Sequence, residues 1–203
     1  MRVALLGGTG RTGKLVAPLL VERGHEVRAL TRGGDVPGGD TIEQVRGEAT
    51  NAANVASLVQ GCDAVIATLA STNSDPVCSQ AASAVIEAAQ HGGPGRYIAI
   101  SGAGVDAEGD QKGVPDKLIG LVMKVVVGGM LRDRQRELEM LQVSPLDWTL
   151  ARPPRLTDGE AKGYRTSLER PPSTAITRAD LAAFLVDQLE TTEFVRRAPF
   201  VSN

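Results

Sequence analysis

A cluster of glycines near the start of the chain constrains the fold more than any other feature. Residues 7–13, GGTGRTG, follow a short apolar run and precede a stretch with helical spacing of apolar side chains. Residues without Cβ permit a tight turn and a close approach of the backbone to a pyrophosphate, and the helix start offers N–H groups to phosphate. This strand–turn–helix context predicts a dinucleotide-binding site. The alternative is a glycine-rich turn without a ligand.

Two glycine patterns overlap in this turn. Gly8, Gly10 and Gly13 fit G-x-G-x-x-G. Gly7, Gly10 and Gly13 fit G-x-x-G-x-x-G. Both patterns serve the same physical purpose, and the sequence leaves the choice between them open.

The rest of the chain alternates between strand-like and helix-like segments. Apolar runs predict strands at residues 26–31, 42–46, 64–67, 97–100 and 147–151, and residues 200–201 predict a short extra strand. This alternation is typical of the α/β class with a single doubly wound parallel (Rossmann) sheet, in strand order 3-2-1-4-5-6. The length of 203 residues fits one nucleotide-binding domain that spans residues 1–203. The loops after the strands should line one crevice at the carboxyl edge of the sheet.

Composition narrows the class of partner. A net charge of −2 gives no electrostatic reason to expect nucleic acid. The longest apolar stretch, residues 118–131, is interrupted by Lys124 and is too short to span a bilayer. Two cysteines share no motif, and two histidines offer no metal-ligand spacing, so no metal site is predicted. We therefore expect a cytoplasmic protein with reduced thiols and a small-molecule partner.

The residue after the second predicted strand discriminates between NAD and NADP. An acidic residue there would bond the ribose hydroxyls of NAD, but this chain has Arg32. A guanidinium suits a 2′-phosphate because its planar fork matches the phosphate oxygens, and Arg11 supplies a second cation. We therefore expect NADP(H), with a solvated surface arginine as the alternative for Arg32. Glu48 and Ala49 are expected near the adenine in this topology.

Three segments carry further structural expectations. Asp75 and Pro76 predict a helix start with Asp75 as N-cap. Residues 105–131 are expected to form a lid or an oligomer contact, with an ordinary packed helix as the alternative for the apolar part. Residues 131–142 predict a charged helix that turns three leucines inward, Leu131, Leu138 and Leu141.

Four segments together resemble a known group of proteins. They are GGTGRTG (7–13), LTR (30–32), YIAIS (97–101) and DWTLARPPR (147–155). Their combination is similar to the atypical short-chain dehydrogenases that lack the catalytic tyrosine, the NmrA-like and NAD(P)H-binding proteins, and within them to the biliverdin-IXβ/flavin reductase type. The resemblance spans nearly the whole chain.

The usual acid–base pair of the short-chain dehydrogenases is missing from this sequence. That pair is a tyrosine with a lysine four residues later. Here Tyr97 and Tyr164 are followed at that distance by Ser101 and Leu168. Alcohol–ketone chemistry and sugar epimerisation, which need a primed phenol, are therefore not expected.

The resemblance implies roles for individual residues. Residues that would hold the pyrophosphate and the 2′-phosphate are Gly7, Thr9, Gly10, Arg11, Thr12, Gly13 and Arg32. Leu69, Ala70 and Ser71 would pass beside the nicotinamide ribose. Ser101 would lie near the nicotinamide, and Pro154 would also contact the cofactor.

Arg155 and Arg134 stand where the resembled reductase has histidines. Arginine stays protonated, so neither can act as a neutral acid or base, but each can anchor an acidic group of a substrate. Hydride transfer to a flavin, a quinone or a linear tetrapyrrole needs no protein base, because the proton can come from water. The candidate catalytic residues are therefore Ser101, Arg155 and Arg134.

Two functions are compatible with these observations. The first is an NADPH-dependent oxidoreductase that passes hydride to a planar conjugated acceptor. The second is a non-catalytic NADP(H)-binding redox sensor of the NmrA-like kind, with residues 118–131 as a contact surface for a partner or for a second copy of the chain. An isomerase or ligand-binding relative that keeps the cofactor for structure is a third option.

Overall fold

The computed structural model describes residues 1–71, 75–111 and 128–203 of the chain. Most of the segment expected to be a lid, including its apolar part at residues 118–127, lies outside the described residues. None of the described helices is both long and apolar enough to cross a membrane.

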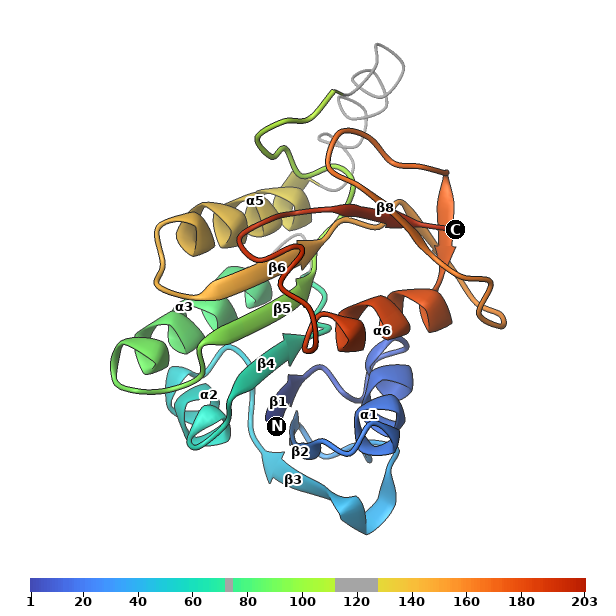
Figure 1. Cartoon of the computed structure of the whole chain (residues 1–203). Coiled ribbons are helices and arrows are strands. Elements are labelled where there is room, and N and C mark those ends of the chain that lie inside the picture. The colour runs from blue at the N-terminus through green and yellow to red at the C-terminus, as the bar shows by residue number, and fades with distance from the viewer. Residues whose placement is uncertain (72–74, 112–127) are drawn as a thin grey trace.

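Six parallel strands form the central sheet (Figure 1). They are β1 (Arg2–Leu6), β2 (Glu26–Thr31), β3 (Ile42–Arg46), β4 (Ala64–Ala67), β5 (Arg96–Ile100) and β6 (Asp147–Ala151). Their spatial order, β3-β2-β1-β4-β5-β6, confirms the predicted doubly wound sheet. The order reverses between β1 and β4, where Leu6 lies opposite Ala67, so the ligand-binding crevice of this fold class is expected above these two strand ends.

Helices cover both faces of the sheet. On one face lie α2 (Ala52–Val59), α3 (Val77–Gln90) and α5 (Gly128–Gln142), and on the other lie α1 (Gly13–Glu22) and α6 (Arg178–Asp187), as Figure 1 shows. A short 3₁₀ turn, η1 (Gly39–Thr41), precedes β3. Alternate residues of one strand enter different core clusters, Ala4 and Leu6 with α2, α3 and α5, and Val3 and Leu5 with α1 and α6. Burial on both faces explains the continuous apolar runs in the sequence.

Four short strands supplement the sheet, where the sequence predicted one. They are β7 (Arg155–Thr157), β8 (Arg165–Ser167), β9 (Ala175–Thr177) and β10 (Phe200–Ser202). β7 pairs with β9 in parallel and β8 pairs with β10 in antiparallel orientation. Each strand has three residues, which is too short for a visible alternation of apolar and polar side chains.

The start of α3 differs from the prediction. Asp75 is not the N-cap, because Pro76 occupies that position. The carboxylate of Asp133, on α5, instead accepts the backbone N–H groups of Cys78 and Ser79 at 2.9 and 3.0 Å. The start of α3 is thus capped by a neighbouring helix, 55 residues away in sequence for Cys78.

α5 is longer than predicted, and its buried face is more polar. It begins at Gly128 rather than at residue 131. Leu138 and Leu141 are buried as predicted, whereas Leu131 is partly buried. Asp133, Arg134 and Glu137 are also buried on this helix. The inward face of α5 therefore combines leucines with three charged side chains.

An arginine that the sequence analysis did not single out lies just after β6, where the C-terminal segment runs along the edge of that strand. Arg152 is 1% exposed. Its guanidinium donates to both carboxylate oxygens of Asp110, at 2.7 and 2.8 Å, and to the carbonyls of Val105 and Ala198 at 3.0 and 2.7 Å. The guanidinium carbon also lies 3.8 Å from the ring centre of Phe200. Arg152 thus joins the loop after β5 to the C-terminal segment.

Candidate functional site

The glycine turn after β1 leaves no space for side chains at two positions. Gly7 has φ +85°, and a Cβ there would lie 2.9 Å from the carbonyl carbon of Thr68. A Cβ on Gly13 would lie 2.1 Å from the carbonyl oxygen of Gly7, so α1 packs directly on the turn. Gly10 closes the turn by donating its N–H to the same oxygen at 2.9 Å. Gly7, which belongs only to the second of the two overlapping patterns, thus requires glycine, and so does Gly13, whereas a Cβ on Gly8 would lie 3.0 Å from the side chain of Val36.

The turn leads into a helix start suited to an anion. Thr12 is the N-cap of α1, and its buried side chain makes no capping hydrogen bond. The first N–H groups of a helix have no acceptor within the helix, and the helix dipole favours negative charge there. Gly10 and Thr9, in the turn, are exposed. The geometry fits a pyrophosphate held by backbone N–H groups above the turn.

Cations gather at the carboxyl ends of β1, β2 and β3. Arg11 and Arg32 are exposed, and neither makes a hydrogen bond or an ion pair to any described part of the chain. The loop that carries Arg32 is fixed, because the Thr31 hydroxyl donates to the Gly34 carbonyl at 2.6 Å. Arg46, which the sequence analysis did not identify, ends β3 opposite Thr31 and is also exposed. This edge is suited to a phosphate monoester.

The residues expected near the adenine follow β3 at the same edge. Glu48 is exposed, and its N–H donates to the side-chain oxygen of Asn54 at 3.0 Å. Ala49 packs partly buried against the core. Gly47 donates its N–H to the Thr31 carbonyl at 2.9 Å, which fixes this loop beside the end of β2.

The ends of β4 and β5 lie on the other side of β1. The Thr68 N–H donates to the Leu6 carbonyl at 2.8 Å, and its hydroxyl donates to the Gly7 carbonyl at 3.0 Å. The loop of Leu69, Ala70 and Ser71 therefore begins directly beside the glycine turn. A dinucleotide with its phosphates over that turn and its 2′-phosphate at Arg32 would extend its other half over β4 and β5, which lie on the other side of β1 from β2.

Ser101, directly after β5, carries an unused hydroxyl. The residue is 9% exposed, and its N–H donates to the Ala151 carbonyl at 2.7 Å. Its buried Oγ makes no hydrogen bond within the described chain. Leaving a buried hydroxyl without a partner costs about 1–3 kcal/mol, so such a group calls for an explanation. A ligand above the ends of β4 and β5 would provide the missing partner.

The loop after β6 completes this side of the crevice. The Pro153 carbonyl accepts the Ala103 N–H at 3.0 Å, which ties the loop after β6 to the loop after β5. Pro154 is partly buried, and Arg155 is exposed at the start of β7. The side chain of Arg155 makes no ion pair with the described residues. Its position leaves it free to meet an acidic group.

Arg134, unlike Arg155, is not free to meet an acidic group of a ligand. Its side chain is buried, and its guanidinium donates to the carboxylate of Glu137 at 3.1 Å and to the Leu69 carbonyl at 2.5 Å. The expectation that Arg134 anchors an acidic group of a substrate does not fit this geometry. The guanidinium is committed to the protein itself, beneath the loop after β4.

Asp133 lies next to Arg134 in the same buried layer. Besides the two N–H groups of α3, its carboxylate accepts the Ser71 hydroxyl. Burial by itself would raise the pKa of this carboxyl, but the hydrogen bonds from Ser71, Ser79 and Cys78 lower it below its ordinary value. The thiol of Cys78, beside Ser71, has its pKa raised to about 12 by burial. Asp133 is therefore a structural anion, and Cys78 is not a nucleophile.

Neither tyrosine is placed to act as an acid. Tyr97 is fully buried, and its hydroxyl donates to Glu137 at 2.8 Å. The Tyr164 hydroxyl donates to Asp187 at 2.6 Å. Burial and the neighbouring carboxylate raise the pKa of both phenols. The missing tyrosine–lysine pair is thus not replaced by a phenol elsewhere in the chain.

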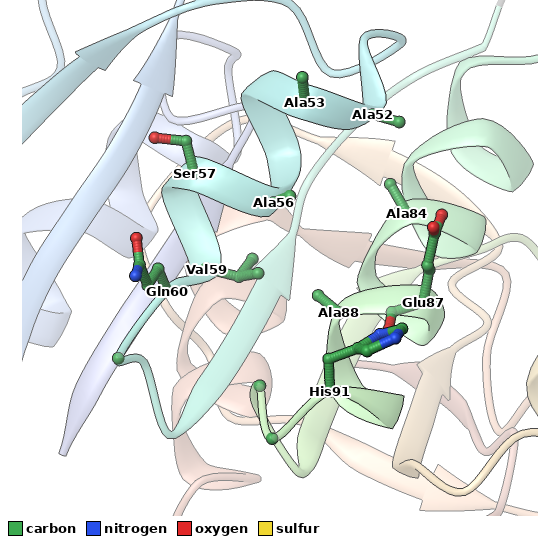
Figure 2. Close-up of a pocket in the computed structure, with 13 residues that line it drawn as sticks. Ala52, Ala53, Ala56, Ser57, Val59, Gln60, Ala84, Glu87, Ala88 and His91 are labelled. Carbon is green, nitrogen blue, oxygen red and sulfur yellow. The ribbon is translucent and has the colours of Figure 1, made fainter.

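A cavity of about 540 Å³ lies between α2 and α3, and Figure 2 shows its walls of small side chains, Ala52, Ala53, Ala56, Ala84 and Ala88. Residues that lead into the amino ends of β4 and β5, including Gly61 and Gly93, also line it. The Nδ1 atom of His91, on the same wall, lies 2.9 Å from the Glu87 carbonyl, to which it donates when it carries the proton. This cavity lies between helices on one face of the sheet, and none of its described lining residues belongs to the glycine turn.

Comparison with known sequences and structures agrees with the geometry. A curated 3-beta-hydroxysteroid dehydrogenase of Mycolicibacterium neoaurum is 39% identical over 70 residues, which is 34% of this chain and 19% of that protein. ChuY, an anaerobillin reductase from Escherichia coli O157:H7, superposes with a TM-score of 0.80 at 20% identity, over 100% of this chain and 97% of that one.

A short-chain dehydrogenase/reductase from Veillonella parvula DSM 2008, solved in complex with NADP, also superposes with a TM-score of 0.80. It is 17% identical, over 100% of this chain and 94% of that one. At these identities the two structures show a shared fold. The sequence profile of NAD(P)H-binding proteins matches residues 7–192, from the first glycine of the turn to beyond α6. The chain therefore belongs to the NAD(P)H-binding family.

Proposed function

We propose that this chain is an NADPH-dependent reductase that transfers hydride to a planar conjugated acceptor such as a flavin, a quinone or a linear tetrapyrrole. The observation that carries the proposal is the buried Ser101 hydroxyl without a partner, directly after β5. It lies on the side of the glycine turn opposite to Arg32. A dinucleotide that spans both places its redox-active end at this hydroxyl.

The residues present fit the cofactor. Gly7 and Gly13 pack so closely that a Cβ on Gly13 would collide with the Gly7 carbonyl. This packing brings the start of α1 against the turn, where a pyrophosphate can approach the backbone. Arg11 and Arg32 are available for a 2′-phosphate because no described residue pairs with them. These arginines favour NADPH over NADH. When bound, the nicotinamide supplies the hydride, and the protein supplies position and exclusion of water.

The acceptor class is inferred from where the tyrosines and histidines of the chain lie, all of which the structure describes. Both tyrosines are used internally, and both histidines lie at the amino edge of the sheet, His25 before β2 and His91 before β5. A substrate that needs a protein acid is therefore disfavoured. Arg155 is exposed and stays charged, which suits an acidic side chain of an acceptor. The name of ChuY as an anaerobillin reductase supports a linear tetrapyrrole within this class.

One observation favours the alternative of a redox sensor without turnover. The described ionisable side chains beneath the ends of β4 and β5, namely Asp133, Arg134 and Glu137, are all occupied by bonds within the protein. A site that only registers the bound nucleotide needs no free acid or base. The sensor would then report on the NADPH to NADP ratio through the shape of its surface.

Anaerobic oxidation of NADPH, with FMN and biliverdin as separate acceptors and NADH in parallel, tests the proposal. We expect turnover that prefers NADPH and that falls in Ser101→Ala and Arg155→Gln. Ser144→Ala is the matched control, because it removes a buried serine hydroxyl at the opposite edge of the sheet. Tight NADPH binding without oxidation by either acceptor would favour the sensor, and failure to bind either nucleotide would contradict both functions.

A further inference from the structure

We propose that Asp133 and Arg134 of α5 are positioning residues for the nicotinamide half of the cofactor site, an inference that rests on the proposed NADPH function. They hold the loop of residues 69–71 from below, so that α5, rather than the loop itself, determines its shape. Neither residue is expected to touch the cofactor. The role replaces the anchoring function that the sequence suggested for Arg134.

The contacts hold the first and third residues of segment 69–71, which is part of the loop after β4. Arg134 donates to the Leu69 carbonyl at 2.5 Å, which fixes the orientation of that peptide. The Asp133 carboxylate accepts the Ser71 hydroxyl. Two consecutive residues of one helix thus hold this segment at two positions. A loop held at both positions has little freedom to change shape when a ligand binds.

The same carboxylate also fixes the segment where the chain continues. Asp133 accepts the N–H groups of Cys78 and Ser79 in the first turn of α3. One carboxylate therefore binds both the loop after β4 and the first turn of α3. Loss of this charge would release both together, because a neutral side chain cannot accept as strongly from three donors.

Glu137 and Tyr97 extend the arrangement to β5. Glu137 accepts from Arg134 at 3.1 Å and from the Tyr97 hydroxyl at 2.8 Å. Tyr97 lies on β5, the strand that directly precedes Ser101. A continuous series of hydrogen bonds therefore connects the loop after β4 with the strand that carries the unpartnered hydroxyl. A fully satisfied buried network of this kind favours one geometry.

The charged side chains of α5 are buried, and burying charges costs free energy that a structural role alone would not require. Asp133 and Arg134 are 4% and 7% exposed, and Glu137 is 0% exposed. A buried ion pair commonly stabilises a fold no more than apolar side chains of the same volume do. Leu138 and Leu141 show that α5 accepts apolar side chains on this face. What the charged residues add is a directed hold on a backbone carbonyl and a hydroxyl, which leucine cannot provide.

Binding of two ligands distinguishes a positioning role at the nicotinamide from a general loss of structure. NADPH contains the nicotinamide, whereas 2′-phospho-ADP-ribose keeps the adenosine and phosphate contacts and lacks it. We expect Asp133→Asn and Arg134→Lys to weaken NADPH about tenfold, to leave 2′-phospho-ADP-ribose unchanged within about twofold, and to alter the fluorescence of bound NADPH. Titration calorimetry measures the affinities. Ser71→Ala, which removes the same bond from the loop side with little risk to folding, should act in the same direction.

Two matched controls lie elsewhere in the fold. Asp180→Asn changes a buried carboxylate that, like Asp133, accepts from a hydroxyl and two backbone N–H groups, those of Lys162 and Gly163. Arg28→Lys changes a partly buried arginine of β2 that, like Arg134, donates to a carboxylate, that of Glu43, and to a carbonyl, that of Leu58. Both should leave the ratio of the two affinities unchanged.

The outcomes are distinct. If the unsubstituted protein binds both ligands and the α5 variants weaken both equally, or if the controls shift the ratio as much, the positioning role is wrong and the proposed function stands. If the unsubstituted protein binds neither ligand, the proposed function fails first and the positioning role fails with it. A selective loss for NADPH in the α5 variants and in Ser71→Ala supports the inference.

Discussion

The two ends of the crevice are built in different ways. At the end that we propose for the 2′-phosphate, here called the 2′-phosphate end, exposed arginines follow neighbouring strands, and each would act as a single group. At the end that we propose for the nicotinamide, here called the nicotinamide end, buried charges from α5 hold a loop and a helix start through a shared network. The first arrangement selects a ligand by charge and can be changed one residue at a time. The second sets geometry collectively, so each of its members depends on the others.

The shared centre between the two ends should be the most sensitive position. In Gly13→Ala the new methyl group would meet the Gly7 carbonyl oxygen at 2.1 Å, and backbone cannot move aside cheaply. We expect a loss of about 3 kcal/mol in the free energy of unfolding, measured with urea, and no measurable binding of either NADPH or NADH. Gly95→Ala is the control, since no atom lies within 4 Å of a Cβ there. Retained nucleotide binding in Gly13→Ala would refute the packing of α1 on the turn.

The next effect is confined to the 2′-phosphate end. Arg32→Asp removes a charge-assisted contact, worth about 1.5–3 kcal/mol, and adds repulsion. We expect the ratio of NADPH to NADH affinity to fall about a hundredfold, while the stability of the protein without ligand is unchanged, because Arg32 is exposed. Equilibrium titration with both nucleotides measures the ratio. Equal losses for NADPH and NADH would mean that Arg32 does not recognise the phosphate.

The nicotinamide end should respond to pH in a way that the other end does not. The pKa of Asp133 is lowered in the folded protein, so its contribution to stability is complete above the unfolded pKa of about 4 and is lost as the pH falls through the folded value. We expect Asp133→Asn to lower the free energy of unfolding by about 2 kcal/mol at pH 7, and by much less at pH 3. Urea titrations at both pH values test this. A deficit that is the same at pH 3 would exclude the charge as its cause.

The smallest effect concerns the far member of the network. Tyr97→Phe keeps the ring and removes one hydrogen bond to Glu137, while Arg134 still pairs with that carboxylate. A loss of about 1 kcal/mol is expected from thermal or urea unfolding. Tyr164→Phe removes a comparable bond to Asp187 at a partly buried position and should cost less. The reverse order would indicate that the network contributes little to stability.

The features of the 2′-phosphate end could be predicted from the sequence, because each depends on residues close together in the chain. The glycine turn, the apolar strands and the residue after β2 are each defined within a few positions, and the strand order then follows from the alternation of strands and helices. Even here the sequence left two glycine patterns open. The distinction depends on which carbonyl approaches Gly13, and only the folded turn shows this.

The arrangement at the nicotinamide end could not be predicted from the sequence, because it depends on contacts between residues far apart in the chain. The cap of α3 was assigned to Asp75 because caps are usually local, whereas the actual acceptor is Asp133 on another helix. Arg134 was predicted to be an anchor because it stands where the resembled reductase has a histidine, although charged residues are mostly exposed and its burial was not foreseen. Its burial depends on how α5 packs on α3, which periodicity does not reveal. Arg152 was overlooked for the same reason, since its partners come from distant segments.

The exposure of Arg11 and Arg32 has a consequence for ionic strength. Salt screens exposed charges over about 8 Å at physiological concentration but hardly reaches a buried pair such as Arg134 and Glu137. Added salt would loosen the grip on a 2′-phosphate while the shape of the loop after β4 stays the same. The preference between the two nucleotides would then belong partly to the surrounding solution, whereas the orientation of the reacting ring would belong to the protein alone.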